Sequence, residues 1–194
     1  FNVAKIAPKV SLFKPALAER LINKYLAEYD TVFDPFSGFS GRMIGCENCG
    51  KKYIGQDINE KHISEGNEII AYKNYQNSVL TVQNVLTDAN KKYACLFTCP
   101  PYGGKEHWNI NNDEVEKLVG ITKPDIIVNL AAISSVGKSW SIPQTTMIVN
   151  VVGALNIMEA ARKSGVKPKV LFVGSSEEYM ISDYPMNEHC LLNT

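Results

Sequence analysis

The chain has 194 residues, of which 45% are hydrophobic and 21% are charged, a composition typical of a globular protein with a sizeable core. Its formal net charge is zero, so no global positive field indicates nucleic-acid binding, although a local basic face stays open. The longest apolar runs are of strand length, and no signal-peptide pattern opens the chain, so we expect no membrane association and a cytoplasmic location.

Apolar strand-like runs alternate with helical patterns along the chain. In order, the patterns predict a helix over 16–29, a strand over 31–36, helix 39–49, strand 52–57, helix 60–72, strands 78–85 and 93–98, helix 113–120, strand 125–130, helix 143–164 and strand 169–173. Such alternation is typical of βαβ units. We therefore predict an α/β fold over residues 1–194: one Rossmann-like three-layer sandwich on a mostly parallel, doubly wound sheet of about six strands.

A glycine-containing turn, DPFSGFSGR, follows the first predicted strand, and Asp57 ends the second. Gly38 and Gly41 permit a tight turn and close approach of the backbone to a ligand. The spacing is neither GxGxxG nor the GxxxxGK[ST] of a phosphate loop. A carboxylate about 20 residues after the turn accepts hydrogen bonds from ribose hydroxyls. Together the two features predict an adenosine-type ligand without a strong demand for phosphate; either one alone also fits a plain strand–turn–helix connection.

A rigid corner, Cys99-Pro100-Pro101-Tyr102, ends the fourth predicted strand. Two consecutive prolines cannot continue a ladder, so they form a turn whose carbonyls point away from the sheet. A flipped base could donate its amino hydrogens to an acceptor at this corner, and Tyr102 could stack on the base. A structural turn with a packed tyrosine is the alternative.

Residues 8–115 resemble the S-adenosylmethionine-dependent DNA amino-methyltransferases, through DPFSGFSGR, the later TCPPYGG and the earlier Phe13-Lys14-Pro15. The resemblance implies S-adenosylmethionine as cofactor and DNA as a partner of this half. It assigns the ribose to Asp57 and places Asn84 near the adenine ring. The catalytic corner would be Cys99, Pro100, Pro101 and Tyr102, and the donor pocket would be lined by Lys14, Pro15, Asp34, Phe36, Ser37, Gly38 and Gly41.

Two residues depart from the pattern of that family. Its corner usually opens with Asp, Asn or Ser, and Cys99 is a poorer hydrogen-bond acceptor than any of these. Asn84 stands where the family usually has an acid, which removes one charge-assisted bond. The implied reaction is direct attack of the target nitrogen on the sulfonium methyl, with the protein mainly positioning the reactants. The departures predict weak activity or none.

Residues 116–194 carry a different pattern, with NLAAISSVGKSW after one predicted strand and VGSSEEY after the last. A hydroxyl beside a carboxylate can transfer protons, although SSEE alone also fits a helix start. This stretch resembles the extended short-chain dehydrogenase/reductases, and among them the GDP-mannose 4,6-dehydratases. The resemblance implies NADP as an alternative cofactor, with Ala131, Ala132 and Ser134 against the cofactor and Ser175, Ser176 and Glu177 at the sugar.

The dehydratase resemblance lacks two parts that its family needs. No GxxGxxG turn is present, and Tyr179 is followed by Asp183 rather than by the lysine of a Tyr-xxx-Lys pair. We therefore expect a chimera of a methyltransferase-like half (1–115) and a dehydratase-like half (116–194). The leading hypothesis is a protein that binds S-adenosylmethionine and has weak or no methyltransferase activity. The alternatives are an NADP-dependent lyase or oxidoreductase acting on a sugar nucleotide, and a folded chain without catalysis.

The five cysteines are an odd number, which favours reduced thiols over a disulfide framework. Cys46 and Cys49 form one CxxC pair, but no second pair of ligands has suitable spacing. We expect no metal site.

Overall fold

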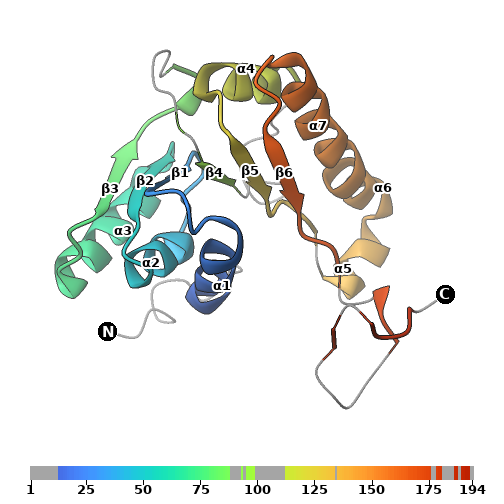
Figure 1. Ribbon diagram of the computed structural model, residues 1–194, viewed down its shortest axis with the longest axis horizontal. Helices are drawn as coiled ribbons and strands as arrows, with labels where there is room; N and C mark the ends of the chain where they lie inside the picture. The colour runs from blue at the N-terminus through green and yellow to red at the C-terminus, as the bar shows by residue number, and fades with distance from the viewer. Residues whose placement is uncertain are drawn as a thin grey trace.

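The computed structural model describes residues 13–87, 93, 95–98, 112–133, 135–175, 178–180, 186–187 and 189–192. In most of the chain, helical segments separate successive strands (Figure 1). They are α1 (Pro15–Tyr25), β1 (Thr31–Asp34), α2 (Gly41–Asn48), β2 (Lys52–Asp57), α3 (Glu60–Lys73), β3 (Ser78–Val82), the 3-10 turn η2 (Val85–Thr87), β4 (Cys95–Thr98), α4 (Asn112–Thr122), β5 (Ile126–Asn129), α5 (Val136–Ser141), α6 (Pro143–Met147), the π-helical turn η3 (Ile148–Val152), α7 (Gly153–Lys163) and β6 (Lys169–Phe172).

The six strands form one sheet in the order β3-β2-β1-β4-β5-β6. All five neighbouring pairs are parallel, so each connection crosses back over the sheet. This is the strand order of the Rossmann fold, and its direction of winding reverses between β1 and β4. The predicted α/β, Rossmann-like class with a doubly wound parallel sheet is confirmed.

The two faces of the sheet are buried by different helices, which makes three layers (Figure 1). Neighbouring strand residues point to opposite faces, so Val32 packs with α1, α2 and α3 whereas Phe33 packs with α4 and α7. In the same way Val128 belongs to the first cluster and Ile127 to the second. Continuous apolar strands are needed here because both faces of a parallel sheet are covered.

The helix predicted over 143–164 is divided into α6, η3 and α7, and α5 lies in a stretch that was expected to be a turn. Pro143 begins α6 because proline is tolerated only in the first turn of a helix. Ser135 begins α5 by accepting a hydrogen bond from the Lys138 amide at 3.4 Å. The cap at Ser135 thus starts the short helix α5 in a stretch whose small residues show no helical periodicity.

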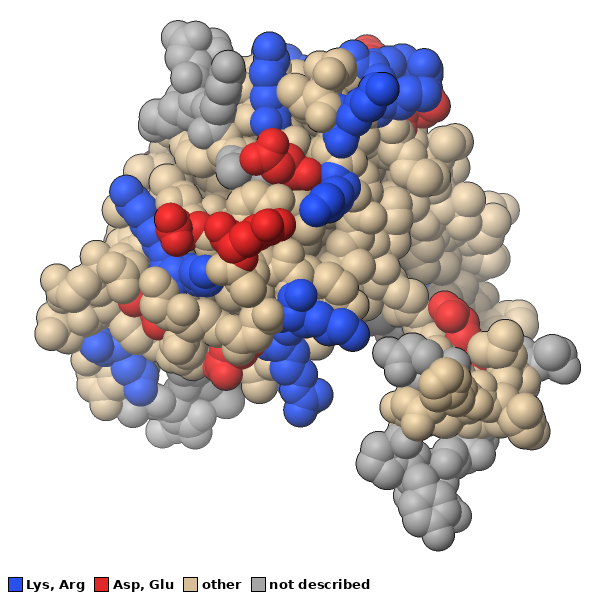
Figure 2. Space-filling model, viewed as in Figure 1, with Lys and Arg blue, Asp and Glu red and all other residues tan. Residues whose placement is uncertain are grey.

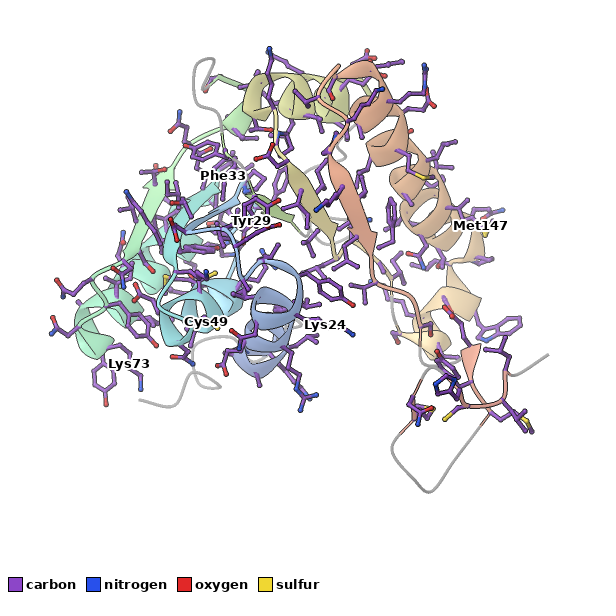
Figure 3. All side chains as sticks on the ribbon, in the orientation of Figure 1. Lys24, Tyr29, Phe33, Cys49, Lys73 and Met147 are labelled. Atoms are coloured by element: carbon purple, nitrogen blue, oxygen red, sulfur yellow. The ribbon has the colours of Figure 1, made fainter. Side chains whose placement is uncertain are left out.

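The two predicted halves of the chain share one hydrophobic cluster. Phe33 and Val85 come from the first half, and both pack with Ile127 and Ile157 of the second. Phe33, which is labelled in Figure 3, also stacks on Tyr93, and the two ring centroids are 3.9 Å apart. The boundary near residue 116 therefore lies inside a common core and not between two separate bodies.

Ile157→Ala should destabilise the whole sheet and not the second half alone. Ile157 is 6% exposed within the shared cluster, so the lost contacts and the cavity should cost about 2–5 kcal/mol. Urea unfolding is monitored by far-ultraviolet circular dichroism and by fluorescence. We expect the midpoint urea concentration to fall and the two signals to change in the same single transition. Two separated transitions would contradict a common core. Met158→Ala, on the exposed side of the same helix, is the control and should change stability little.

Within the part of the chain that the structure describes, no helix is long and apolar enough to cross a membrane.

Candidate functional site

The site lies at the carboxyl ends of the strands, where β1, β2 and β4 finish near the reversal of strand order. Asp34 ends β1 and Asp57 ends β2. The corner that follows β4, Cys99, Pro100, Pro101 and Tyr102, falls outside the described residues. The described part of the site is therefore the turn after β1 and the acid after β2.

Asp34 is fully buried beneath the turn. Its Oδ2 accepts hydrogen bonds from Arg42 Nε at 2.5 Å and from the Tyr53 hydroxyl at 2.7 Å, and its Oδ1 accepts from the Phe36 amide at 3.1 Å. Burial, and then the charge of Asp34, raise the pKa of Tyr53 well above its ordinary value, so its hydroxyl stays protonated and donates. In the structure Asp34 supports the turn through these bonds, and its predicted place in the lining of a donor pocket stays a prediction.

The turn itself is held from both sides. Arg42 donates to the Phe36 carbonyl at 2.5 Å, and the Ser37 amide donates to the Gln56 carbonyl of β2 at 2.9 Å. Gly38 has φ +50° and Ser40 has φ +62°, so two residues adopt the left-handed conformation before α2 begins. Ser37 and Ser40 are both buried, and neither hydroxyl has a partner among the described residues.

Asp57 reaches back to the same turn. Its Oδ2 accepts from the Gly38 amide at 2.9 Å and from His62 Nδ1 at 3.4 Å, and its Oδ1 accepts from the Asn59 amide at 2.8 Å. Burial acts to raise the pKa of Asp57, but the bonds from His62, Asn59 and Gly38 outweigh it and lower that pKa. An ionised carboxylate has about four acceptor positions, two on each oxygen. Gly38 and His62 use those on Oδ2 and Asn59 uses one on Oδ1, so one acceptor position on Oδ1 remains when only described groups are counted.

The N-terminal residues of the predicted pocket lie directly on the start of α2. A Cβ at Gly41 would stand 2.0 Å from the carbonyl oxygen of Phe13, and one at Gly45 would stand 2.9 Å from that of Pro15. The Phe13 ring also lies 5.7 Å from the Arg42 guanidinium carbon, within reach of a cation–π contact. Lys14 precedes the first residue of α1. The structure thus brings together two motifs that are separated by some 20 residues of sequence.

Asn84 is engaged by its own turn after β3. Its Oδ1 accepts from the Leu86 amide at 3.0 Å, and its carbonyl accepts from the Thr87 hydroxyl at 2.8 Å. This residue begins η2, as an asparagine side chain commonly does in such turns. The role at an adenine ring stays a prediction.

The predicted dehydratase residues after β5 are only partly described. Ala131 and Ala132 are half-buried, and the Ala131 amide donates to Asn129 Oδ1 at 3.2 Å. Two bonds join Ile133 to Asn150 on η3: the Ile133 amide donates to Oδ1 at 2.8 Å, and Nδ2 donates to the Ile133 carbonyl at 3.3 Å. Ser134, Ser176 and Glu177 lie outside the described residues. After β6, the Ser175 amide donates to Glu178 Oε1 at 3.1 Å.

Sequence reasoning missed the partners of both acids. Tyr53 and His62 were not singled out, because one looks like a core aromatic residue within a strand and the other like a polar residue on a helix. A signal was present for His62, since it lies in the first turn of α3, just after the strand that Asp57 ends. The Phe39 ring covers His62 with centroids 4.4 Å apart, and this contact is visible only in three dimensions.

The described thiols Cys46, Cys49, Cys95 and Cys190 are free. Burial raises the pKa of Cys46, and it raises that of Cys95 to about 12, so neither forms a reactive thiolate near neutral pH. Among the described residues, no group of three or more His, Cys, Asp or Glu side chains could hold a metal ion.

Gly41→Ala should displace the segment that contains Phe13. Because the new methyl group would stand 2.0 Å from a backbone oxygen, the contact should cost about 1–3 kcal/mol of stability. Gly120→Ala in α4 is the matched control, since a Cβ there meets nothing within 4 Å, and it should be neutral or stabilising. Thermal unfolding of both variants checks the prediction, and equal melting temperatures would show that residue 13 does not rest on Gly41.

Two family models match this chain. The GDP-mannose 4,6 dehydratase family matches residues 52–191, and the DNA methylase family matches residues 12–68. The dehydratase match begins at β2, well before the predicted boundary at 116, and the two matches overlap over 52–68. Both family models therefore recognise β2 and the start of α3. The two matches support the interpretation of the chain as a chimera of these families.

Curated relatives of the chain include dehydratases and epimerases. GDP-mannose 4,6 dehydratase 2 of Arabidopsis thaliana is 37% identical over 78 residues, covering 38% of this chain and 21% of that protein. A bifunctional UDP-glucose and UDP-xylose 4-epimerase of Pisum sativum is 27% identical, covering 67% of this chain and 36% of that protein. A solved UDP-glucose-4-epimerase from Stenotrophomonas maltophila, 15% identical with a TM-score of 0.51, covers 84% of this chain and 42% of that chain and shares the fold.

The chain spans from about a fifth to somewhat over a third of the length of these curated relatives. The dehydratase model nevertheless matches most of the described sheet, from β2 to β6 and beyond. The chain therefore belongs to the GDP-mannose 4,6 dehydratase family, with a first part that matches the DNA methylase family.

Proposed function

We propose that the chain binds S-adenosylmethionine at the carboxyl ends of β1 and β2 and that it has, at most, weak methyltransferase activity. The amino group of an adenine or cytosine in DNA would be the acceptor, and Cys99, Pro100, Pro101 and Tyr102 would form the corner that receives it. The bound donor would supply an electrophilic methyl group. The residues of the chain would hold the nucleoside part of the donor and orient the base.

One observation carries the proposal: the Asp57 carboxylate is joined to the turn after β1 and keeps an acceptor position. Gly38 and Asn59 donate to it from the backbone and His62 from its side chain, which leaves a single position on Oδ1 among the described groups. A ribose hydroxyl is a donor that suits this position. The lowered pKa of Asp57 keeps the carboxylate ionised at neutral pH, so that both of its oxygens act only as acceptors.

The geometry at the start of α2 favours a ligand that carries no phosphate. In dinucleotide-binding proteins a pyrophosphate lies at the N-terminus of the helix after the first strand. Here the carbonyl oxygen of Phe13 lies against Gly41, the first residue of that helix. An anion would be repelled by this oxygen and would have to displace the segment, whereas the sulfonium donor carries no phosphate.

Calorimetric titration with S-adenosylmethionine, S-adenosylhomocysteine, NAD and NADP tests the proposal. We expect binding of the first two and no heat from the dinucleotides. Incorporation of a labelled methyl group into DNA would then measure residual transfer, which we expect to be slow because Cys99 is a weak acceptor. Binding of NADP alone would overturn the proposal.

The second candidate is an NADP-dependent dehydratase acting on a sugar nucleotide, and the family match over residues 52–191 favours it. Ala131, Ala132 and Ser134 would contact the cofactor, and Ser175, Ser176 and Glu177 would contact the sugar. The candidate lacks a GxxGxxG turn and a Tyr-xxx-Lys pair in this sequence. The same titration separates the two candidates, and absence of all binding would favour a folded chain without catalysis.

A further inference from the structure

The strand β3 forms one edge of the sheet and lies at the left margin of Figure 1. On its inner side, the Tyr53 amide donates to the Asn77 carbonyl at 2.8 Å, and the Gln83 amide donates to the Asp57 carbonyl at 3.0 Å. Backbone groups alternate between the two sides of a strand, so every second residue from 77 to 83 faces β2. The residues between them, whose amides and carbonyls point outward, are Ser78, Leu80 and Val82. None of these outward groups has a partner among the described residues.

The edge at β3 is not protected by its own residues against pairing with another strand. Edge strands are normally protected by charged side chains, above all lysine, by proline or by a bulge. No Asp, Glu, Lys, Arg or Pro occurs from residue 74 to residue 87, and β3 pairs with β2 in one unbroken register. Val79 and Val82 are 51% and 49% exposed, and Thr81 between them is exposed as well. The outward side of β3 is therefore a regular, neutral and accessible hydrogen-bonding edge.

The opposite edge of the sheet, at β6, differs in this respect. Lys169 begins β6, Lys167 precedes it by two residues, and both are exposed. Figure 2 shows lysine and arginine side chains gathered at the upper right, over the end of α7 and the start of β6. Lysine is the residue that most often blocks pairing at an edge strand. The lack of charge is therefore a property of β3 and not of both edges of the sheet.

We propose that β3 pairs with β3 of a second copy of this chain, so that the two sheets continue into one another. A two-fold axis perpendicular to the sheet makes the two strands antiparallel and closes the assembly at two copies. With the axis at Leu80, the Leu80 residues of the two copies face each other, and Ser78 of each copy faces Val82 of the other. Residues that face each other in this way exchange both of their backbone hydrogen bonds. Every outward amide and carbonyl of β3 then has a partner, which is the reason for choosing this register.

The side chains agree with the same register. Leu80 packs in the cluster beneath α3, so Val79 and Thr81 lie on the other face of the strand. There Val79 of each copy faces Thr81 of the other, and such β-branched pairs stabilise a sheet. Glu47 accepts from the Ser78 hydroxyl at 2.6 Å at the start of β3, and antiparallel pairing places the two copies of this acid at opposite ends of the contact. Like charges therefore do not meet across the axis.

Amide hydrogen exchange of the wild-type chain, followed for each residue by NMR, tests the proposal. The contact is short, so we expect a dimer dissociation constant on the order of 100 µM. The outward amides of β3 should then exchange about fourfold more slowly at about 1 mM protein than at about 20 µM. The control is β6, where the Lys169 amide donates to Asp125 and the amides of Val170 and Phe172 point outward; their rates should not depend on concentration. Rates at β3 that are equally independent of concentration would overturn the proposal.

Two double variants at the same exposed positions test the register. Val79→Lys/Thr81→Lys sets like charges against each other across the axis and should abolish the fourfold slowing, whereas Val79→Lys/Thr81→Glu sets opposite charges against each other and should keep it. Slowing in both variants, or in neither, would overturn the proposed pairing. The wild-type experiment decides the matter even if a variant fails to fold, and its readout at single residues is not changed by association through another surface. Neither experiment involves a cofactor, so the result is independent of methyl-donor binding.

Discussion

Asp34→Ala is expected to destabilise the protein by about 3–5 kcal/mol, because it removes the carboxylate that pairs with the buried guanidinium of Arg42. Arg42 is 7% exposed at its side chain and Asp34 is fully buried, so solvent cannot replace the lost carboxylate. The Tyr53 hydroxyl and the Phe36 amide would lose their acceptor as well. A loss of this size is a large fraction of the stability of a small domain.

Urea unfolding measures this loss, with Asp30→Ala as the matched control. Asp30 is an exposed acid just before β1, so its removal should change the free energy of unfolding by less than about 0.5 kcal/mol. Asp34→Asn should fall between the two, since the amide oxygen still accepts while the charge is lost. A loss below about 1 kcal/mol in Asp34→Ala would mean that the Arg42 charge finds water or another partner.

Asp57→Ala is expected to reduce the affinity for S-adenosylmethionine by at least about 100-fold. The change removes the acceptor proposed for the ribose, and it also releases the Gly38 amide, whose bond to Oδ2 at 2.9 Å holds the turn. A lost charge-assisted bond accounts for about 1.5–3 kcal/mol of this effect, and loosening of the turn adds to it.

Titration calorimetry on Asp57→Ala and on Glu60→Ala checks this expectation. Glu60 is an exposed acid in the first turn of α3, so the control keeps the change in charge but not the contact with the turn. The melting temperature of each variant separates loss of binding from loss of fold. An unchanged affinity in folded Asp57→Ala would place the donor elsewhere.

Much of the candidate site follows from local rules of sequence. The turn after β1 needs left-handed backbone, and Gly38 supplies it in a stretch bounded by a buried strand and a helix. Asp57 ends β2, the strand that follows β1 and α2 in the chain. Because β1 and β2 are parallel, their carboxyl ends lie at the same edge of the sheet, so Asp57 lies near the turn after β1. The resemblance to DNA methyltransferases identified Phe13, Lys14 and Pro15 through a motif, and the structure sets Phe13 and Pro15 against Gly41 and Gly45.

Other features could not be predicted, because they depend on packing between distant segments. The burial of Asp34 follows from Arg42 and Tyr53, which reach it from α2 and β2. The division of the helix over 143–164 reflects a π-helical turn that brings Asn150 to the Ile133 backbone. The sequence around Asp34 does not indicate that Arg42 and Tyr53 contact it, and the sequence around Ile133 does not indicate that Asn150 binds its backbone.

The order of apolar strands and helices was sufficient for the α/β class, since period-two and helical patterns depend on each residue and its near neighbours. Which acid stays accessible, and which becomes a buried support, depended on tertiary contacts. Asp34 and Asp57 both end a strand, yet one meets a buried guanidinium and the other meets two backbone amides and a histidine. These partners contact the carboxylates only after the helices pack on the sheet. The sequence alone therefore could not tell which carboxylate is buried and which is accessible.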